Sequence, residues 1–161
     1  MENLKNGYSI DAIGNFSIGK KFFVVPEVMV SYASDKNPIV CPVGVFELPI
    51  KEITLYPEYV NRTVIKVVFD TDGLQALEGT EQFSIVTLNK NKEITDRTGA
   101  NFSEKEVGAN NMFHQASIKA KERMEYATVS LTNEINKCMK TIANNESALT
   151  IINNAKKTLN W

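Results

Sequence analysis

Apolar and polar residues alternate in short runs over the first hundred residues, whereas apolar residues recur every three or four positions over the last fifty. The clearest alternation lies in residues 61–69. There Ile65 and Val67 share one face of an extended chain, and Arg62 and Lys66 share the other. This pattern is typical of a β-strand with one buried face. Similar runs predict strands at residues 21–32, 39–48, 51–56, 61–69 and 82–88.

Five prolines fall inside or beside these runs, at Pro26, Pro38, Pro42, Pro49 and Pro57. Proline has no N–H to donate to a β-ladder, so the strands are expected to be short, bent or at sheet edges. No segment between them is long enough for the helix of a parallel βαβ unit. Residues 1–105 are therefore predicted to form an antiparallel β-sandwich or open barrel of five to seven short strands, with residues 89–111 as a polar connector.

The last fifty residues contain neither proline nor glycine and are predicted to be helical. Apolar residues step by three or four from Phe113 to Ile142, which matches the α-helical period of about 3.6 residues. Asn144 and Asn145 interrupt this stripe, and the stepping resumes up to Leu159. We therefore expect residues 106–161 to form a hairpin of one long helix and one shorter helix, which makes the fold class α+β.

The long helix is expected to carry more apolar surface than one subunit can cover. A helix of some 30 residues is roughly 45 Å long, whereas a compact chain of this size has a radius of gyration of about 15 Å. Uncovered apolar surface usually marks an interface. The helices are therefore predicted to mediate homo-oligomerisation. The predicted interface residues are Phe113, Ala116, Ala120, Met124, Ala127, Leu131, Ile135, Cys138, Ile142, Ile152 and Leu159.

Composition limits the classes of function. Of the 161 residues 43% are apolar, and 18 Lys and Arg stand against 19 Asp and Glu. The chain therefore lacks the basic excess of proteins that bind nucleic acid by charge alone. No apolar run is long enough to cross a bilayer, and Cys41 and Cys138 form no metal or disulfide motif. We expect a cytoplasmic protein with two buried thiols, no cofactor and no membrane partner.

A smaller set of residues suits a ligand or a nucleic acid. Lys20 lies beside Phe22, and aromatic and basic residues together form the stacking platforms of single-strand binders. Lys119, Arg123 and Lys137 give the helices a basic tilt, although acidic residues are interleaved with them. A nucleotide, a small ligand or single-stranded nucleic acid is therefore an alternative partner. Further aromatic candidates are Tyr32, Tyr56 and Tyr59.

The apolar run ending at Phe69, followed by Asp70-Thr71-Asp72-Gly73, resembles the first motif of haloacid-dehalogenase-type phosphatases. The resemblance implies a metal-assisted hydrolase with Asp70 as nucleophile, Asp72 as general acid/base and Mg²⁺ between them. Leu74 stands where the family usually has Thr or Val, and residues 107–161 contain no Asp for its downstream acidic motif. Asp-Gly is also a common turn after a strand. A turn is the structure we expect here.

The sequence contains no other catalytic pattern, since the single histidine, His114, has neither a nucleophile nor a carboxylate next to it. The prediction is a non-enzymatic interaction or assembly protein that self-associates through its C-terminal helices. A binding module for the ligands named above is the alternative. The 17 asparagines suit an AT-rich genome or a mobile element, so a viral accessory role is a further expectation.

Overall fold

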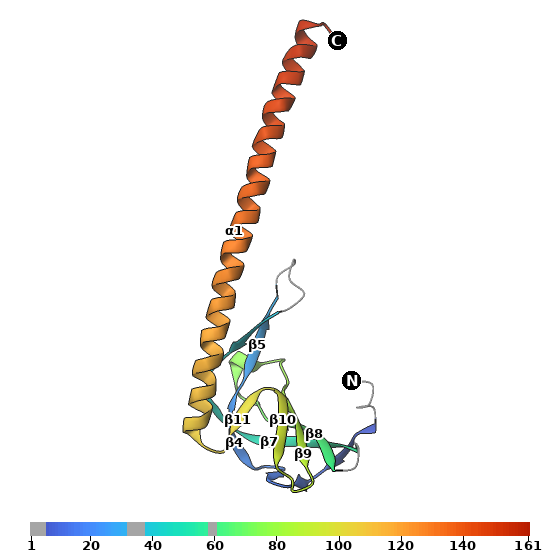
Figure 1. Cartoon of the computed structure of the whole chain (residues 1–161), viewed down its shortest axis with the longest axis vertical. Helices are drawn as coiled ribbons and strands as arrows, with labels where there is room; N and C mark the ends of the chain where they lie inside the picture. Colours follow the sequence, from blue (N-terminus) through green and yellow to red (C-terminus); the bar gives the residue numbers. More distant parts are fainter. Residues whose placement is uncertain (1–5, 32–37, 58–60) are drawn as a thin grey trace. The chain divides into compact units, whose positions relative to one another are not determined.

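The computed structural model describes residues 6–31, 38–57 and 61–161. The chain divides into two compact units, Met1–Ala120 and Lys121–Trp161. The first unit holds the β-strands of the described residues and the beginning of the helix α1 (Glu106–Thr158), and the second holds the rest of that helix. Figure 1 labels the main elements. The predicted α+β class, with a β-rich part followed by helix, is confirmed.

The first unit is built around one antiparallel sheet of seven strands. The order across the sheet is β10-β9-β8-β7-β4-β11. β1 and β4 pair with different parts of the same edge of β7, opposite the edge that pairs with β8. The strands are β1 (Tyr8–Ile10), β4 (Lys21–Val25), β7 (Phe46–Pro57), β8 (Arg62–Phe69), β9 (Gln82–Asn89), β10 (Ile94–Gly99) and β11 (Asn101–Ser103). Two separate hairpins are β2 (Ala12–Ile13) with β3 (Phe16–Ser17), and β5 (Glu27–Val30) with β6 (Ile39–Pro42).

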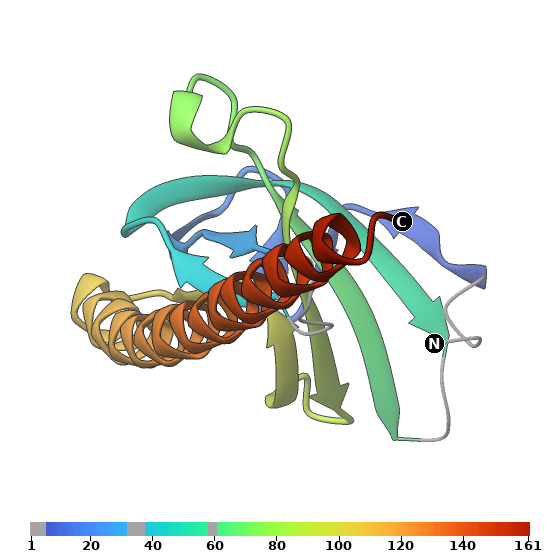
Figure 2. The ribbon, with the colours of Figure 1, turned by 90° about the horizontal axis from the view of Figure 1, so that it is seen from above.

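The sheet curls into a nearly closed barrel, and Figure 2 shows β7 and β8 as long curved ribbons. Its two terminal strands, β10 and β11, follow each other in the chain and are joined at Ala100. Arg97 of β10 donates from Nη1 to the carbonyl oxygen of Phe102 in β11, at 2.8 Å. The Ser84 hydroxyl of β9 donates to the carbonyl oxygen of Ala100. Arg97 therefore joins the two edge strands, which share no backbone ladder, and Ser84 holds the residue between them.

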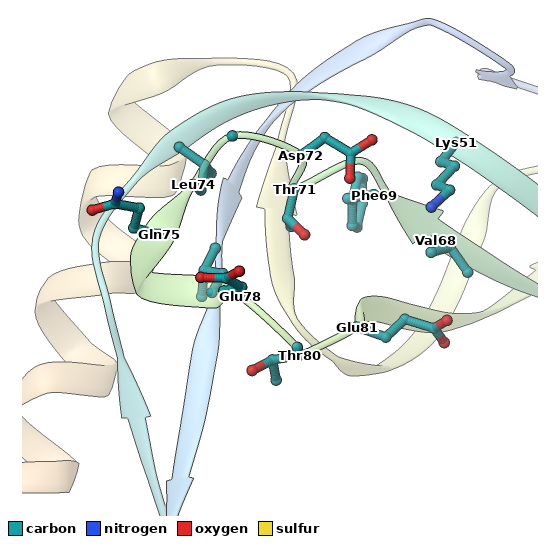
Figure 3. A pocket seen from close by; sticks show the side chains of 13 residues that line it. Lys51, Val68, Phe69, Thr71, Asp72, Leu74, Gln75, Glu78, Thr80 and Glu81 are labelled. Carbon is teal, nitrogen blue, oxygen red and sulfur yellow. The ribbon is translucent and has the colours of Figure 1, made fainter.

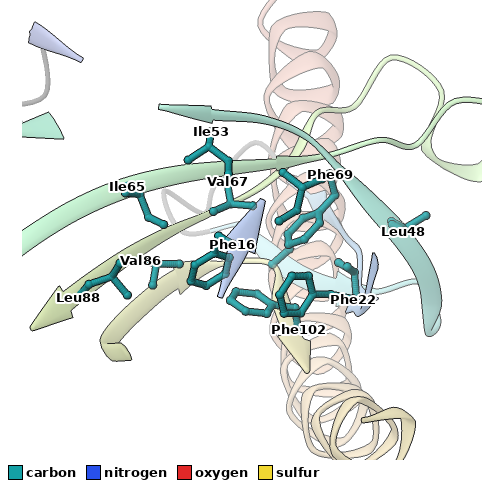
Figure 4. Close-up of a cluster of buried hydrophobic side chains, with 13 residues drawn as sticks. Phe16, Phe22, Leu48, Ile53, Ile65, Val67, Phe69, Val86, Leu88 and Phe102 are labelled. Atoms are coloured by element: carbon teal, nitrogen blue, oxygen red, sulfur yellow. The ribbon is translucent and has the colours of Figure 1, made fainter. Parts of the chain in front are cut away.

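The barrel is filled by apolar side chains from alternate strand positions (Figure 4). Phe102 lies at the centre of an aromatic group, with ring centroids 5.8, 5.4 and 5.7 Å from those of Phe16, Phe22 and Phe69. Aromatic rings at such distances attract each other beyond their burial from water. The period-two pattern of the sequence therefore identified the core correctly on β8, where Ile65 and Val67 are fully buried.

The prolines divide the strands at places that the run lengths did not show. The predicted strand 21–32 is split at Pro26 into β4 and β5, and its last residue, Tyr32, lies outside the described residues. Predicted strands 39–48 and 51–56 became β6 and a single β7 that contains Pro49. Pro49 precedes Ile50, which pairs with Phe69, the last residue of β8. Pro49 itself pairs with Lys21 of β4, and its carbonyl oxygen accepts the N–H of Asp70 at 2.9 Å.

The predicted connector 89–111 is wrong, because it contains β10, β11 and the start of α1. β10 is an edge strand with almost every residue exposed, so its sequence has no apolar alternation to detect. The turn before it is held by Asn89, whose Oδ1 accepts the N–H groups of Asn91 at 2.9 Å and Glu93 at 3.0 Å. Such side-chain turns depend on local hydrogen bonds and leave no periodic signal.

The predicted helical hairpin is also wrong, since α1 is one uninterrupted helix of 53 residues. It is about 80 Å long at 1.5 Å per residue. Asn144 and Asn145 do not end it, because an asparagine inside a helix costs only about 0.5–0.7 kcal/mol relative to alanine. Glycine or proline is needed for a strong break, and none occurs after Gly108. The first turns of α1 belong to the β unit, where Ala109 is fully buried.

Candidate functional site

The C-terminal part of α1 presents a bare apolar face. Every residue from Thr132 to Trp161 is exposed. This stretch includes large apolar side chains that normally lie in a core: Ile135, Ile142, Leu149, Ile152 and Leu159 are between 51% and 59% exposed. A helix that carries such residues without covering them has the character of an interface.

Because the helix is unbroken, its apolar residues can be followed in one register through Asn145. Positions 124, 128, 131, 135, 138, 142, 145, 149, 152, 156 and 159 step by four and three in strict alternation, an average of 3.5 residues. This is the heptad repeat of left-handed coiled coils, in which alternate positions are named a and d. We call these eleven positions the heptad seam. Its residues are Met124, Thr128, Leu131, Ile135, Cys138, Ile142, Asn145, Leu149, Ile152, Lys156 and Leu159.

The predicted interface residues divide between the seam and the β unit. Seven of them, Met124, Leu131, Ile135, Cys138, Ile142, Ile152 and Leu159, lie on the heptad seam. Phe113, Ala116 and Ala120 belong to the first unit, and Ala120 is only 6% exposed. Ala127 is also 6% exposed and lies one position before the seam residue Thr128. Sequence reasoning missed Leu149, because a break at Asn145 shifts the register that follows it.

The seam has four positions that are not large and apolar. The Thr128 hydroxyl donates to the carbonyl oxygen of Met124 at 2.8 Å, so this side chain needs no partner outside the helix. Because a step of three leads from a to d, Cys138 and Asn145 are d positions and Lys156 is an a position. Asn145 and Lys156 bring polar groups to the seam, and a polar residue at an a position is known to fix the register and partner number of coiled coils. Cys138 is exposed and unbonded, and Cys41 is half-buried, so the expectation of two buried thiols is wrong.

The helical cations proposed for nucleic acid lie away from the seam. Lys119, Arg123 and Lys137 are exposed. Arg123 and Lys137 are fourteen residues apart, two heptads, so they share one helix face. Each of the two residues directly precedes a seam residue, Met124 or Cys138, and this position lies on the outer surface of a coiled coil. The structure therefore separates these cations from the apolar face.

A pocket of about 620 Å³ opens beside the gap between β10 and β11. Phe16, Phe22 and Phe102 contribute apolar wall. Lys92, Arg97 and Lys105 contribute positive charge, and Glu93 and Glu104 contribute negative charge. Within the described residues, no carboxylate forms an ion pair with these three cations. The Arg97 guanidinium lies 5.3 Å from the ring of Phe102. Apolar walls with a few placed charges are typical of small-ligand sites.

Lys20 and Phe22, the other predicted ligand residues, are both engaged within the fold. The Lys20 ammonium pairs with Glu104 at 2.9 Å and donates to the carbonyl oxygen of Asn15 at 2.8 Å. Phe22 is 3% exposed and stacks on Phe16, with 5.6 Å between ring centroids. This ring is therefore core and not an open stacking platform. Tyr56 is half-buried, and Tyr59 lies outside the described residues.

The Asp70–Gly73 segment forms a turn beside a second pocket of about 580 Å³ (Figure 3). Asp70 Oδ1 accepts the backbone N–H of Asp72 at 3.0 Å, and Gly73 has a φ of 86°. An acceptor two residues before its donor and a left-handed glycine are the parts of an Asx turn. Asp72, Glu78 and Glu81 line the pocket with Lys51. Within the described part of the chain, no group of three or more His, Cys, Asp and Glu residues could hold a metal.

Comparison with known proteins identifies no relative. No protein-family description matches the chain, and no curated protein or solved structure matches it. Likewise, no helix among the described residues has both the length and the apolar character needed to cross a membrane. The chemistry of the seam and of the pocket at the barrel gap must therefore carry the functional argument.

Proposed function

We propose that this is a non-enzymatic assembly protein that self-associates through the heptad seam of α1. The partner is a second copy of the same chain, and association of the helices brings the β units of the copies into one assembly. The observation that carries the proposal is the exposed 3.5-residue repeat, because it continues through Asn145 without a change of register.

The composition of the exposed helix supports the need for a partner. In residues 132–158, 14 of the 27 residues are Asn, Thr or Ile, all of which have lower helix propensity than alanine. Most helical stability in proteins comes from packing an amphipathic face and not from propensity. A stretch with weak propensity and no packing partner would be marginal alone. Packing the seam of one copy against another supplies the missing contacts.

The seam residues also supply enough apolar surface. Fully burying an isoleucine or leucine side chain is worth about 1.5–3 kcal/mol. The five most C-terminal large residues of the seam are each a little more than half exposed, so burying the remainder gives about 1 kcal/mol per side chain. In a dimer this free energy is counted once for each copy, because the seam residues of both copies are buried in the contact.

Light scattering on the full chain tests the proposal. A self-associating protein gives a mass at a multiple of 18.0 kDa that falls on dilution. Ile142→Asp, which places a charge in the seam, should give the monomer mass because an unpaired charge is costly to bury. Ile151→Asp is the matched control, since Ile151 is 69% exposed and lies one position before the seam residue Ile152. A wild-type monomer at all concentrations would reject the proposal.

A second candidate function is the binding of an anionic ligand with an apolar part, such as a nucleotide, in the pocket at the barrel gap. It is favoured by three cations that line the pocket together with phenylalanines. Two carboxylates, Glu93 and Glu104, also line it, but among the described residues neither forms an ion pair with these cations. A charge-assisted hydrogen bond contributes about 1.5–3 kcal/mol, or about 10-fold to 140-fold in affinity.

Titration with ATP that carries a fluorescent ribose label tests this candidate. Lys92→Ala and Lys105→Ala should each weaken binding about 10-fold or more. Lys90→Ala is the control, because Lys90 is exposed in the same turn as Lys92 but does not line the pocket. Equal loss in all three variants would indicate general charge attraction and reject the pocket as the site.

A further inference from the structure

We infer that the helices associate parallel and in register, with Asn145 as the residue that sets this alignment. The inference rests on the proposed self-association and specifies its geometry. In a parallel in-register coiled coil each seam residue meets its own counterpart, d against d and a against a. Asn145 then faces Asn145, and each amide has both a donor and an acceptor with which to bond the other.

The parallel arrangement matches polar with polar and apolar with apolar along the whole seam. Ile135, Ile142, Leu149, Ile152 and Leu159 each meet an identical apolar side chain. Thr128 keeps its hydroxyl bonded to the carbonyl oxygen of Met124 and presents its methyl group. Lys156 is the seam position before Leu159 and lies in the last turn of α1, where a long side chain can extend its ammonium into water.

An antiparallel arrangement cannot match each seam residue with its own counterpart, because it sets d positions against a positions. The alignment that overlaps the whole exposed seam places Ile135 opposite Leu159. It then places Asn145 opposite Leu149 and Cys138 opposite Lys156. The Asn145 amide would lie against an apolar side chain without a hydrogen bond, which is costly for a buried polar group.

Shifted antiparallel alignments relieve Asn145 only by losing other contacts. Setting Asn145 opposite Thr128 places Ile152 opposite Lys121 and leaves Leu159 beyond the seam. Setting Asn145 opposite Lys156 leaves Ile135 without a partner. The parallel in-register alignment is therefore the one that buries the entire repeat and pairs its central amide.

Disulfide trapping tests the alignment in the full chain. The Cys41→Ser variant keeps Cys138 as its single thiol, and Cys41→Ala serves if the serine variant does not fold. Parallel in-register helices bring two Cys138 residues together at one d layer. A disulfide requires Cα atoms about 4.4–6.8 Å apart. In the full antiparallel overlap the two Cys138 residues are 18 positions apart, about 27 Å along the axis. Mild oxidation should therefore convert most of the protein to a covalent dimer.

Two further variants exclude chance collisions and the opposite orientation. Lys137→Cys in a chain without other thiols places the cysteine on the outer face, and it should crosslink at least 10-fold more slowly than Cys138. Chains with Cys138 alone, refolded together with larger tagged chains that carry only Lys156→Cys, should give no mixed disulfide. A mixed disulfide would overturn the parallel alignment.

The outcomes separate this inference from the proposed function. A monomer by light scattering rejects self-association itself. An oligomer whose Cys138 residues do not crosslink, or crosslink to position 156, rejects only the parallel alignment. Asn145→Leu should keep the oligomer but give both kinds of disulfide, since all alignments then have an apolar residue at this position. Unchanged selectivity in Asn145→Leu would overturn the role assigned to Asn145.

Discussion

Replacing Ile135 by alanine should weaken self-association by an amount that its exposure sets. Ile135 is 59% exposed in the single chain, so association can bury little more than half of its side chain. Full burial of isoleucine is worth about 1.5–3 kcal/mol, which leaves about 1–1.8 kcal/mol per copy for the interface. Two copies lose about 2–3.5 kcal/mol, and the dissociation constant of a dimer should rise about 30-fold to 300-fold.

Sedimentation velocity over a dilution series measures this change. Ile151→Ala is the matched control, because Ile151 is 69% exposed but lies off the seam. Both substitutions replace isoleucine by alanine in the same helix, so the gain in helix propensity is common to both. We expect the control to shift the dissociation constant less than threefold. Equal shifts in the two variants would refute the heptad assignment, even if the protein proves to be an oligomer.

Three predictions concern the β unit, each read from urea unfolding of the full chain. Gly99→Ala should lower the free energy of unfolding by about 1–3 kcal/mol more than Gly73→Ala. Both glycines have positive φ, but an added Cβ at Gly99 would lie 2.5 Å from the Phe83 carbonyl oxygen and at Gly73 would meet nothing within 4 Å. Phe102→Ala should cost about 3–5 kcal/mol, and a loss below 1 kcal/mol would contradict its central place in the aromatic group. Burial raises the pKa of Glu27 above its ordinary value of 4.5, so the folded state binds this proton more tightly than the unfolded chain. The wild type should therefore lose stability relative to Glu27→Gln as the pH rises above about 4.5, and a constant difference between pH 4 and pH 7 would contradict this.

The sequence pattern was sufficient for the long strands that bury one face. On β8 the alternation of Ile65 and Val67 with Arg62 and Lys66 predicted the strand to within one residue. On β10 it failed, because an edge strand exposed on both sides needs no alternation. The small strands β1, β2 and β3 were missed for a related reason, since two or three residues are too few for a period to be seen.

The helix was predicted, but its continuity was not, and the candidate site depended on that continuity. Reading Asn144 and Asn145 as a break gave two helices and two unrelated registers. The cost of two asparagines is small against the propagation of a long helix, and the same pair becomes part of a single repeat once the break is removed. The pocket at the barrel gap could not be predicted, because Phe16, Lys92, Arg97 and Lys105 are brought together only by the closing of the sheet.

The bond from Arg97 to the Phe102 carbonyl oxygen joins two strands of the barrel that share no backbone ladder. Where neighbouring strands share a ladder, parting them breaks several backbone hydrogen bonds at once. Between β10 and β11 the Arg97 bond takes the place of such a ladder, and a hydrogen bond to a charged group is worth about 1.5–3 kcal/mol. The contact between β10 and β11 should thus open far more often than the whole domain unfolds, while Ala100 stays bonded to Ser84 and to the backbone of Phe83. Opening of this contact would widen the adjacent pocket and let a larger ligand enter.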